Sequence, residues 1–168
     1  MIENPVPEMF VVPFRVLFLC THNSSRSQMA EGLLRARGGN DFQAFSAGTY
    51  PGHVHRLAIK VMAELGIDIS EHAGHYAKEL GAFNDQPPMD LVVTVCEKAA
   101  ERCPSFPKAR RQVHWGFPDP VDAPGSEQER LATFRHIRDL IATRINLYLA
   151  VSQVTYQSSG KKKKAVCS

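Results

Sequence analysis

The chain has 168 residues, with 20 basic and 17 acidic side chains, a length that suits one domain with a substantial core. Four of the basic residues form the run KKKK at 161–164, so the rest of the chain, with 16 basic against 17 acidic residues, is close to neutral. This balance argues against a nucleic-acid-binding surface, and no apolar run reaches the length of a membrane span.

The segment 15–35 contains a strand, a polar loop and an amphipathic helix in succession. The apolar run 16–19 predicts a buried β-strand. Apolar residues at helical spacing from Met29 onward predict a helix that begins near Ser27 and ends at Gly38. Only short polar residues lie between the two elements. The pattern therefore places a cysteine, Cys20, at the end of the strand and an arginine, Arg26, at the start of the helix.

Cys20 and Arg26, six positions apart, give this loop the chemistry of an anion-binding site. Backbone N–H groups in such a loop and the helix N-terminus attract oxyanions, and Arg26 can add a bidentate contact. The same field favours a thiolate, so we expect a lowered pKa for Cys20 and a nucleophilic role. Asn23 tolerates the left-handed backbone that the loop needs. The expected substrate contacts are Thr21, His22, Asn23, Ser24, Ser25, Arg26 and Ser27.

Strands and helices alternate along the rest of the chain. Strands are predicted at 43–47, 91–95 and 113–116, and helical spacing of apolar residues occupies 57–65. A capping box, Ser126 to Glu129, begins a last helix that we expect to end near Ala150. The pattern predicts a single α/β domain with a four-stranded parallel sheet in the order 2-1-3-4 and helices on both faces.

The domain is expected to span residues 15–152. An extension at 1–14 precedes it, and a lysine-rich tail at 153–168, expected to be disordered, follows it. Two short helices are also predicted near 73–80 and 97–102. The start of the chain carries acidic residues and prolines where an export signal has basic residues, and four cysteines suit a reducing compartment. We therefore expect a cytoplasmic protein.

Three reactive side chains are expected on one rim of the sheet. The carboxyl ends of parallel strands meet at the same edge, where α/β proteins bind ligands. Cys20 ends the first predicted strand, Cys96 ends the third, and Asp119 follows the fourth. Asp119 lies between two prolines and suits a general acid, although an aspartate in such a turn can also be only a turn residue.

Cys96 and Cys103 form a second pair of thiols. On an unbroken helix they would be about 10 Å apart along the axis, beyond the roughly 7 Å Cα separation that a disulfide bridges. A bond between them would therefore require the segment to unwind. Three interpretations stay open: a redox-active dithiol, two half-buried thiols, or a zinc site with His114, which the spacing of the pair disfavours.

Four motifs of the chain resemble those of arsenate reductases in the low-molecular-weight protein tyrosine phosphatase superfamily, in the branch that uses three cysteines. The motifs are CTHNSSRSQMAEG from Cys20, SAGT from Ser46, VTVCEKAAERCP from Val93 and HWGFPDP from His114. The resemblance covers about residues 16–149. Gln28, where the phosphatases carry proline, and Val121, where they place an aromatic residue, favour a reductase over the alternative, a tyrosine phosphatase.

The resemblance implies a mechanism based on three thiols. Arsenate would bind in the loop from Cys20 to Arg26, and the Cys20 thiolate would attack arsenic while Asp119 protonates the departing oxygen. Cys96 would then attack the Cys20 sulfur and release arsenite. Cys103 would attack Cys96 in turn, which leaves a disulfide for a thioredoxin-like protein to reduce.

Departures from the family pattern affect the electron donor and a possible ion. His22 replaces a glycine and Ser25 a cysteine, and the Thr-His-Asn loop resembles members in which glutaredoxin and glutathione replace thioredoxin, so both donors stay open. Some members hold a potassium ion through Asn, Glu, Ser and Asp side chains. Three of these ligands are matched here, by Asn23, Glu31 and Ser46. His75 stands at the fourth position, which argues against a potassium site.

The remaining expectations concern partners. We expect a monomer without a tightly bound cofactor or metal, with phosphate and sulfate as competing oxyanions and with no nucleic-acid or membrane partner. Two other functions are compatible with the loop. A phosphatase would use Cys20, Arg26 and Asp119 without the second and third thiols, and a non-enzymatic oxyanion sensor would bind arsenate without producing arsenite.

Overall fold

The computed structural model describes residues 12–71, 78–96 and 106–164, with residues 153–164 described as backbone only. The elements in chain order are β1 (Phe14–Cys20), α1 (Arg26–Arg37), the 3-10 helix η1 (Gly39–Asp41), β2 (Phe42–Gly48), α2 (Arg56–Ala63), the 3-10 helix η3 (Leu80–Phe83), β3 (Leu91–Thr94), β4 (Gln112–His114) and α4 (Glu127–Lys164). The predicted helix at 97–102 and most of the one near 73–80 lie outside the described residues.

The four strands form one parallel sheet in the order β2-β1-β3-β4, as predicted. β1 lies in the middle and pairs with β2 from Phe14↔Phe42 to Cys20↔Gly48. Its last five residues are all buried, which is typical of a parallel strand covered on both faces. Because the chain crosses from one side of β1 to the other between β2 and β3, the carboxyl end of β1 lies at the switch point where α/β sheets bind ligands.

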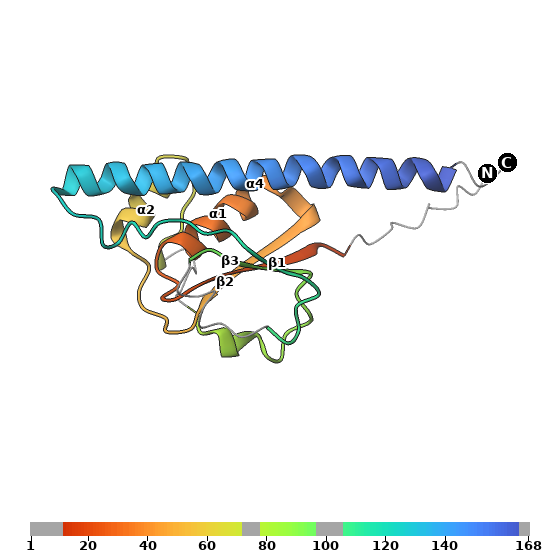
Figure 1. Cartoon of the computed structure of the whole chain (residues 1–168), viewed down its shortest axis with the longest axis horizontal. Helices are drawn as coiled ribbons and strands as arrows, with labels where there is room; N and C mark the ends of the chain where they lie inside the picture. The colour runs from red at the N-terminus through yellow and green to blue at the C-terminus, as the bar shows by residue number, and fades with distance from the viewer. Residues whose placement is uncertain (1–11, 72–77, 97–105, 165–168) are drawn as a thin grey trace, which may run out of the picture.

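The three α-helices of the described residues lie together on one face of the sheet, where α4 crosses α1 and α2 (Figure 1). Alternate residues of β1 point to opposite faces. Phe18 packs into the core beneath these helices, together with Phe134 of α4, whereas Leu19 packs on the other face with Phe83 and Phe106. The sheet is therefore covered on both sides, but within the described chain the second face is covered by η3 and the segment around Phe106.

The last helix begins where the capping box places it. The N–H of Ser126 donates to Glu129 Oε2 at 2.7 Å, and the N–H of Glu129 donates to Ser126 Oγ at 3.3 Å. The helix continues to Lys164, beyond the expected end near Ala150 and through much of the tail expected to be disordered. The apolar stripe predicts an end near Ala150, and Val151 just beyond it is 58% exposed, but no proline follows to end the helix.

The C-terminal part of α4 extends past the end of the sheet (Figure 1). Within the part of the chain that the structure describes, no helix combines the length and the apolar character that crossing a membrane requires.

Candidate active site

The loop between β1 and α1 has the backbone expected of an anion-binding turn. Cys20 is the last residue of β1 and Arg26 is the first of α1. Asn23 has φ 50°, the one positive φ outside glycine among the described residues, and this confirms the left-handed conformation predicted for it. Its side chain is fully buried, so the surrounding structure has to supply every hydrogen bond that it makes.

The carbonyl groups of the loop are tied to the segment that follows β2. Three N–H groups of that segment donate to them: Tyr50 to Thr21 at 2.8 Å, Gly52 to His22 at 2.9 Å and His55 to Ser24 at 2.7 Å. Because the C=O and N–H of a trans peptide point in opposite directions, the N–H of the following residue points into the loop in each case. The N–H of Asn23 reaches Cys20 Sγ at 3.1 Å. The turned-in N–H groups form the concave nest that binds anions.

A chain of hydrogen bonds behind the loop ends on Cys20. Asn23 Oδ1 accepts from the backbone N–H of Lys78 at 2.8 Å and from Gln28 Nε2 at 3.0 Å. Asn23 Nδ2 then donates to Ser27 Oγ at 2.8 Å, and Ser27 Oγ lies 2.8 Å from Cys20 Sγ. A backbone N–H can only donate, which fixes the direction of the chain. Toward a Cys20 thiolate, which can only accept, the Ser27 hydroxyl is the donor. Asn23 and Ser27 thus hold the loop from behind.

The predicted lowering of the Cys20 pKa is wrong for this state of the loop. Burial raises the pKa of the Cys20 thiol, and the neighbouring Cys96 raises it further. The hydrogen bond from Ser27 opposes this rise, and the guanidinium of Arg26 contributes the smallest lowering effect. Arg26 lowers the pKa of Cys20 only weakly, because its guanidinium is turned toward a carboxylate rather than toward the sulfur.

That carboxylate belongs to Asp119, which the structure brings to Cys20 and Arg26 as predicted. Arg26 Nη2 donates to the Asp119 carboxylate, and Arg26 Nη1 donates to the carbonyl of Phe117 at 2.9 Å. The N–H of Val121 donates to the second Asp119 oxygen at 3.1 Å. The loop and the turn 117–122 thus meet through one ion pair, whose aspartate side chain is 35% exposed and whose arginine is buried.

A cavity of about 90 Å³ lies between the loop and this turn. Cys20, Arg26 and Asp119 line it with four other loop side chains, those of Thr21, His22, Ser24 and Ser25. Val121 and Asp122 complete the wall, and neither was predicted to bind substrate. Their position within three residues of Asp119 was the available signal.

Cys96 lies beside the first thiol. The N–H of Val95 donates to the carbonyl of Leu19 at 2.8 Å. The residues that follow these two, Cys96 and Cys20, therefore lie at the same edge of the sheet. Cys96 Sγ lies 3.6 Å from Thr21 Oγ1, and both Cys20 and Cys96 are free and buried. Cys103 lies outside the described residues.

The described residues do not show a metal centre. His114, the third ligand of the zinc hypothesis, makes a 2.7 Å hydrogen bond through Nδ1 to Thr94 Oγ1. Across 12–71, 78–96 and 106–164, no three His, Cys, Asp or Glu side chains are arranged to hold a metal ion.

The three residues that match potassium ligands, Asn23, Glu31 and Ser46, are engaged by other groups of the chain. Glu31 is 1% exposed, and one of its oxygens accepts from the Ser46 hydroxyl and lies 3.5 Å from Lys78 Nζ. The other oxygen accepts from Arg35 at 2.7 Å. The Asn23 oxygen is engaged by Lys78 and Gln28. Cations of the chain itself therefore neutralise Glu31, and His75 lies outside the described residues.

The chain belongs to the low molecular weight phosphotyrosine protein phosphatase family, which it matches over residues 15–160. It is similar to the arsenate reductase of Halalkalibacterium halodurans, with 43% identity over 136 residues that make up 79% of this chain and 93% of the relative. Two solved structures are also similar. An arsenate reductase in the phosphate binding state has a TM-score of 0.65 and 30% identity, covering 81% of this chain and 96% of the other. A thioredoxin-dependent arsenate reductase of Corynebacterium glutamicum has a TM-score of 0.62 and 27% identity, covering 86% and 64%.

Replacing Gly48 by alanine should distort the loop. An added Cβ would lie 2.7 Å from the Thr21 carbonyl oxygen and 2.8 Å from the Asn23 nitrogen, both backbone atoms. We expect strain of roughly 1–3 kcal/mol and about a tenfold to hundredfold loss of phosphate affinity, measured by isothermal titration calorimetry. Gly52→Ala is the control, because its Cβ would meet nothing within 4 Å. Unchanged phosphate binding by Gly48→Ala would contradict the tight approach of β2 to the loop.

Replacing Ser27 by alanine should raise the pKa of Cys20 further, because the variant loses the hydrogen bond that stabilises the thiolate. The midpoint of iodoacetamide labelling against pH should move to higher pH, with labelling several-fold slower at neutral pH. Peptide mass spectrometry separates Cys20 from the other cysteines. Ser24→Ala, which removes a hydroxyl that lines the cavity, should leave the midpoint in place. An unshifted Ser27→Ala profile would show that the hydroxyl does not serve the thiolate.

Replacing Lys78 by methionine should destabilise the protein by about 1 kcal/mol, because the buried Glu31 loses one of its cations while the backbone N–H to Asn23 remains. The melting temperature reports this loss, with the exposed Lys60→Met as the control. Wild-type protein should melt at the same temperature in potassium and sodium chloride of equal concentration. A stabilisation of the wild type by potassium but not by sodium would contradict the assignment of Lys78 as the cation that neutralises Glu31.

Proposed function

We propose that this protein reduces arsenate to arsenite, in a role in arsenic detoxification. The observation that carries the proposal is the second buried thiol beside the oxyanion loop. Cys20, Arg26 and Asp119 line one cavity and would serve any phosphoryl-type transfer. Cys96 at the same edge adds a group that a phosphatase does not need. The arsenate reductase names of the relatives support the same activity.

Arsenate would bind in the loop through its tetrahedral oxygens. The inward N–H groups and the α1 N-terminus attract the anion, and the Arg26 fork turns from Asp119 to the bound oxygens. Phosphate and sulfate have the same shape and compete for the loop. Once released from Arg26, Asp119 is free to take up a proton and act as the general acid.

In the first chemical step, the Cys20 thiolate attacks arsenic. An S–As bond forms and an As–O bond breaks, and the oxygen leaves as water with a proton from Asp119. The hydrogen bonds from Ser27 and from the Asn23 N–H to Cys20 Sγ stabilise the thiolate and orient it.

In the second step, the Cys96 thiolate attacks Cys20 Sγ. A disulfide forms, the electron pair of the broken S–As bond stays on arsenic, and arsenite leaves. Two thiols are oxidised by two electrons while arsenic is reduced by two. Thr21, whose hydroxyl is 3.6 Å from Cys96 Sγ, is placed to orient the incoming thiol.

The third step returns Cys20 to its thiol form. Cys103 attacks Cys96, which releases the Cys20 thiolate and forms a Cys96–Cys103 disulfide. A small dithiol protein then reduces this disulfide. The reductase itself acts in the cytoplasm as a monomer. The thioredoxin dependence of the Corynebacterium glutamicum neighbour favours a thioredoxin-like donor. The Thr-His-Asn sequence of the loop keeps a glutaredoxin and glutathione donor as the other candidate.

A tyrosine phosphatase is the second candidate function, because the family match is to phosphatases and the Cys20, Arg26 and Asp119 arrangement suffices for a phosphoenzyme. In that reaction Cys96 and Cys103 have no role. The two thiols therefore discriminate between the functions.

The decisive experiment measures arsenite formed from arsenate with a thioredoxin system. We expect repeated turnover in the wild type, none above background in Cys20→Ser, Cys96→Ser or Cys103→Ser, and full turnover in Cys167→Ser, which removes a thiol outside the relay. Mass spectrometry of the oxidised wild type should find a Cys96–Cys103 bridge.

Three outcomes would change the assignment. Full turnover by Cys96→Ser would contradict the relay. Turnover only with glutaredoxin and glutathione would keep the chemistry and change the donor. Rapid hydrolysis of an aryl phosphate by the wild type and by Cys96→Ser, without arsenite from either protein, would establish the phosphatase.

A further inference from the structure

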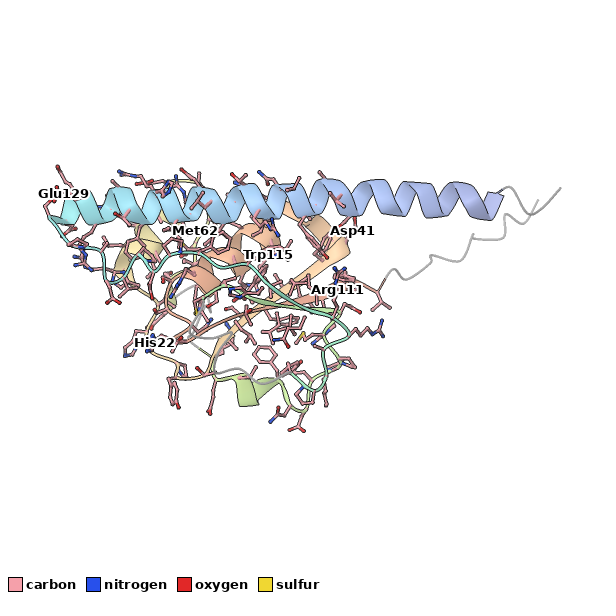
Figure 2. All side chains as sticks on the ribbon, viewed as in Figure 1. His22, Asp41, Met62, Arg111, Trp115 and Glu129 are labelled. Carbon is pink, nitrogen blue, oxygen red and sulfur yellow. The ribbon has the colours of Figure 1, made fainter. Side chains whose placement is uncertain are left out.

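A second, larger cavity of about 410 Å³ lies under the C-terminal half of α4. It runs from the first residue of β1 to the free edge of β4 and shares no described residue with the cavity at Cys20. Its principal walls are Phe14, Arg111, Trp115, Arg144, Leu147 and Val151. Figure 2 shows Trp115 and Arg111 on the side of the sheet that faces α4. We call this cavity the α4 groove.

The α4 groove is apolar and positively charged. Leu147 and Val151 are 57% and 58% exposed, which is unusual for neighbouring large apolar side chains on one helix face. The Arg144 guanidinium lies 5.3 Å from the centre of the Trp115 ring, and Arg111 adds a second positive charge. None of the described lining residues is acidic. A complementary occupant is therefore an apolar segment that carries negative charge.

The segment that precedes the groove has this composition. Residues 1–11, MIENPVPEMFV, contain Glu3 and Glu8 and no basic residue, with apolar side chains between them. The family match begins at residue 15, so this N-terminal arm lies outside the part shared with the family. Neither the family match nor the site at Cys20 accounts for the acidic and apolar character of the arm.

The arm starts at the groove and is long enough to fill it. Phe14, the first residue of β1, lines the groove, and Val12 just before it is 82% exposed. Eleven extended residues reach up to about 36 Å, whereas crossing from β1 over β3 to β4 requires only about 10 Å. A connection this short also gives the arm a millimolar-range effective concentration at the groove, which favours binding within the same chain.

We propose that the N-terminal arm of this chain binds in its own α4 groove. The apolar side chains of the arm cover Leu147 and Val151, and Glu3 and Glu8 pair with Arg111 and Arg144. The arm then joins the beginning of β1 to the part of α4 that extends past the domain, and it covers the free edge of β4. Because the charges lie at the surface, salt screens their part of the attraction.

The test uses Trp115, the single tryptophan of the chain, as a local reporter. The indole N–H resonance of the full chain is compared with that of a variant lacking residues 2–11. We expect a different chemical shift and stronger acrylamide quenching in the truncated variant. Titration of the truncated variant with a synthetic peptide of residues 1–12 should move its Trp115 resonance toward that of the full chain until binding saturates. The affinity of the peptide should fall as the sodium chloride concentration is raised.

Charge exchange tests the pairing. In the double variant Arg111→Glu and Arg144→Glu, removal of residues 2–11 should no longer change the resonance or the quenching of Trp115; this comparison cancels the direct effect of losing the Arg144 contact with the Trp115 ring. Adding Glu3→Arg and Glu8→Arg to that variant should restore protection of Trp115. Replacing the four lysines at 161–164 by serine is the matched control, since it removes a competing basic run and leaves the groove unchanged.

Three results would overturn the proposal. One is an identical Trp115 resonance and equal quenching in the full and truncated chains. Another is loss of protection in the control lacking the lysines at 161–164, which would place the arm at the basic end of α4. The third is protection that disappears on dilution together with a doubled mass at high concentration by light scattering, which would assign the groove to the arm of a second copy.

Discussion

The left-handed backbone at Asn23 is the constraint on which the site depends. This conformation costs free energy outside glycine, and it persists because the Asn23 side chain is held by Lys78, Gln28 and Ser27. These partners come from α1 and from the chain beyond α2. The shape of a loop of a few residues, and the inward direction of its N–H groups, is therefore set by the whole packed domain.

The parallel sheet explains why the reactive groups meet although they are far apart in sequence. With β1 in the centre, the turn after β1 and the turn after β3 share one edge, and the segment after β4 brings Asp119 over the same cavity. Parallel strands require long connections, so these residues are necessarily separated by whole elements. The close approach of Gly48 to the loop backbone shows how little space this arrangement leaves.

Sequence pattern was sufficient for the Asn23 conformation and the capping box, which have local signatures. It was also sufficient for the sheet order and the meeting of Cys20, Arg26 and Asp119, because parallel strands place their carboxyl ends at one edge of the sheet. It failed where the cause is tertiary. The pKa of Cys20 depends on burial and on the ion pair that engages Arg26, and neither can be read from the loop itself. The role of Lys78 depends on a fold that returns it to Glu31, and α4 continues past the last apolar side chains that pack on the domain.

The pairing of Arg26 with Asp119 also affects which anions can bind in the loop. Any anion that enters the loop has to displace the Asp119 carboxylate, to which the Arg26 guanidinium is directly hydrogen-bonded. A halide or another monoanion offers Arg26 little more than Asp119 already does, whereas a doubly charged tetrahedral ion offers more charge and more oxygens. Asp119 is therefore a competitor supplied by the protein itself, and we expect it to lower the apparent affinity for every anion and to leave strongly charged tetrahedral ions with the advantage.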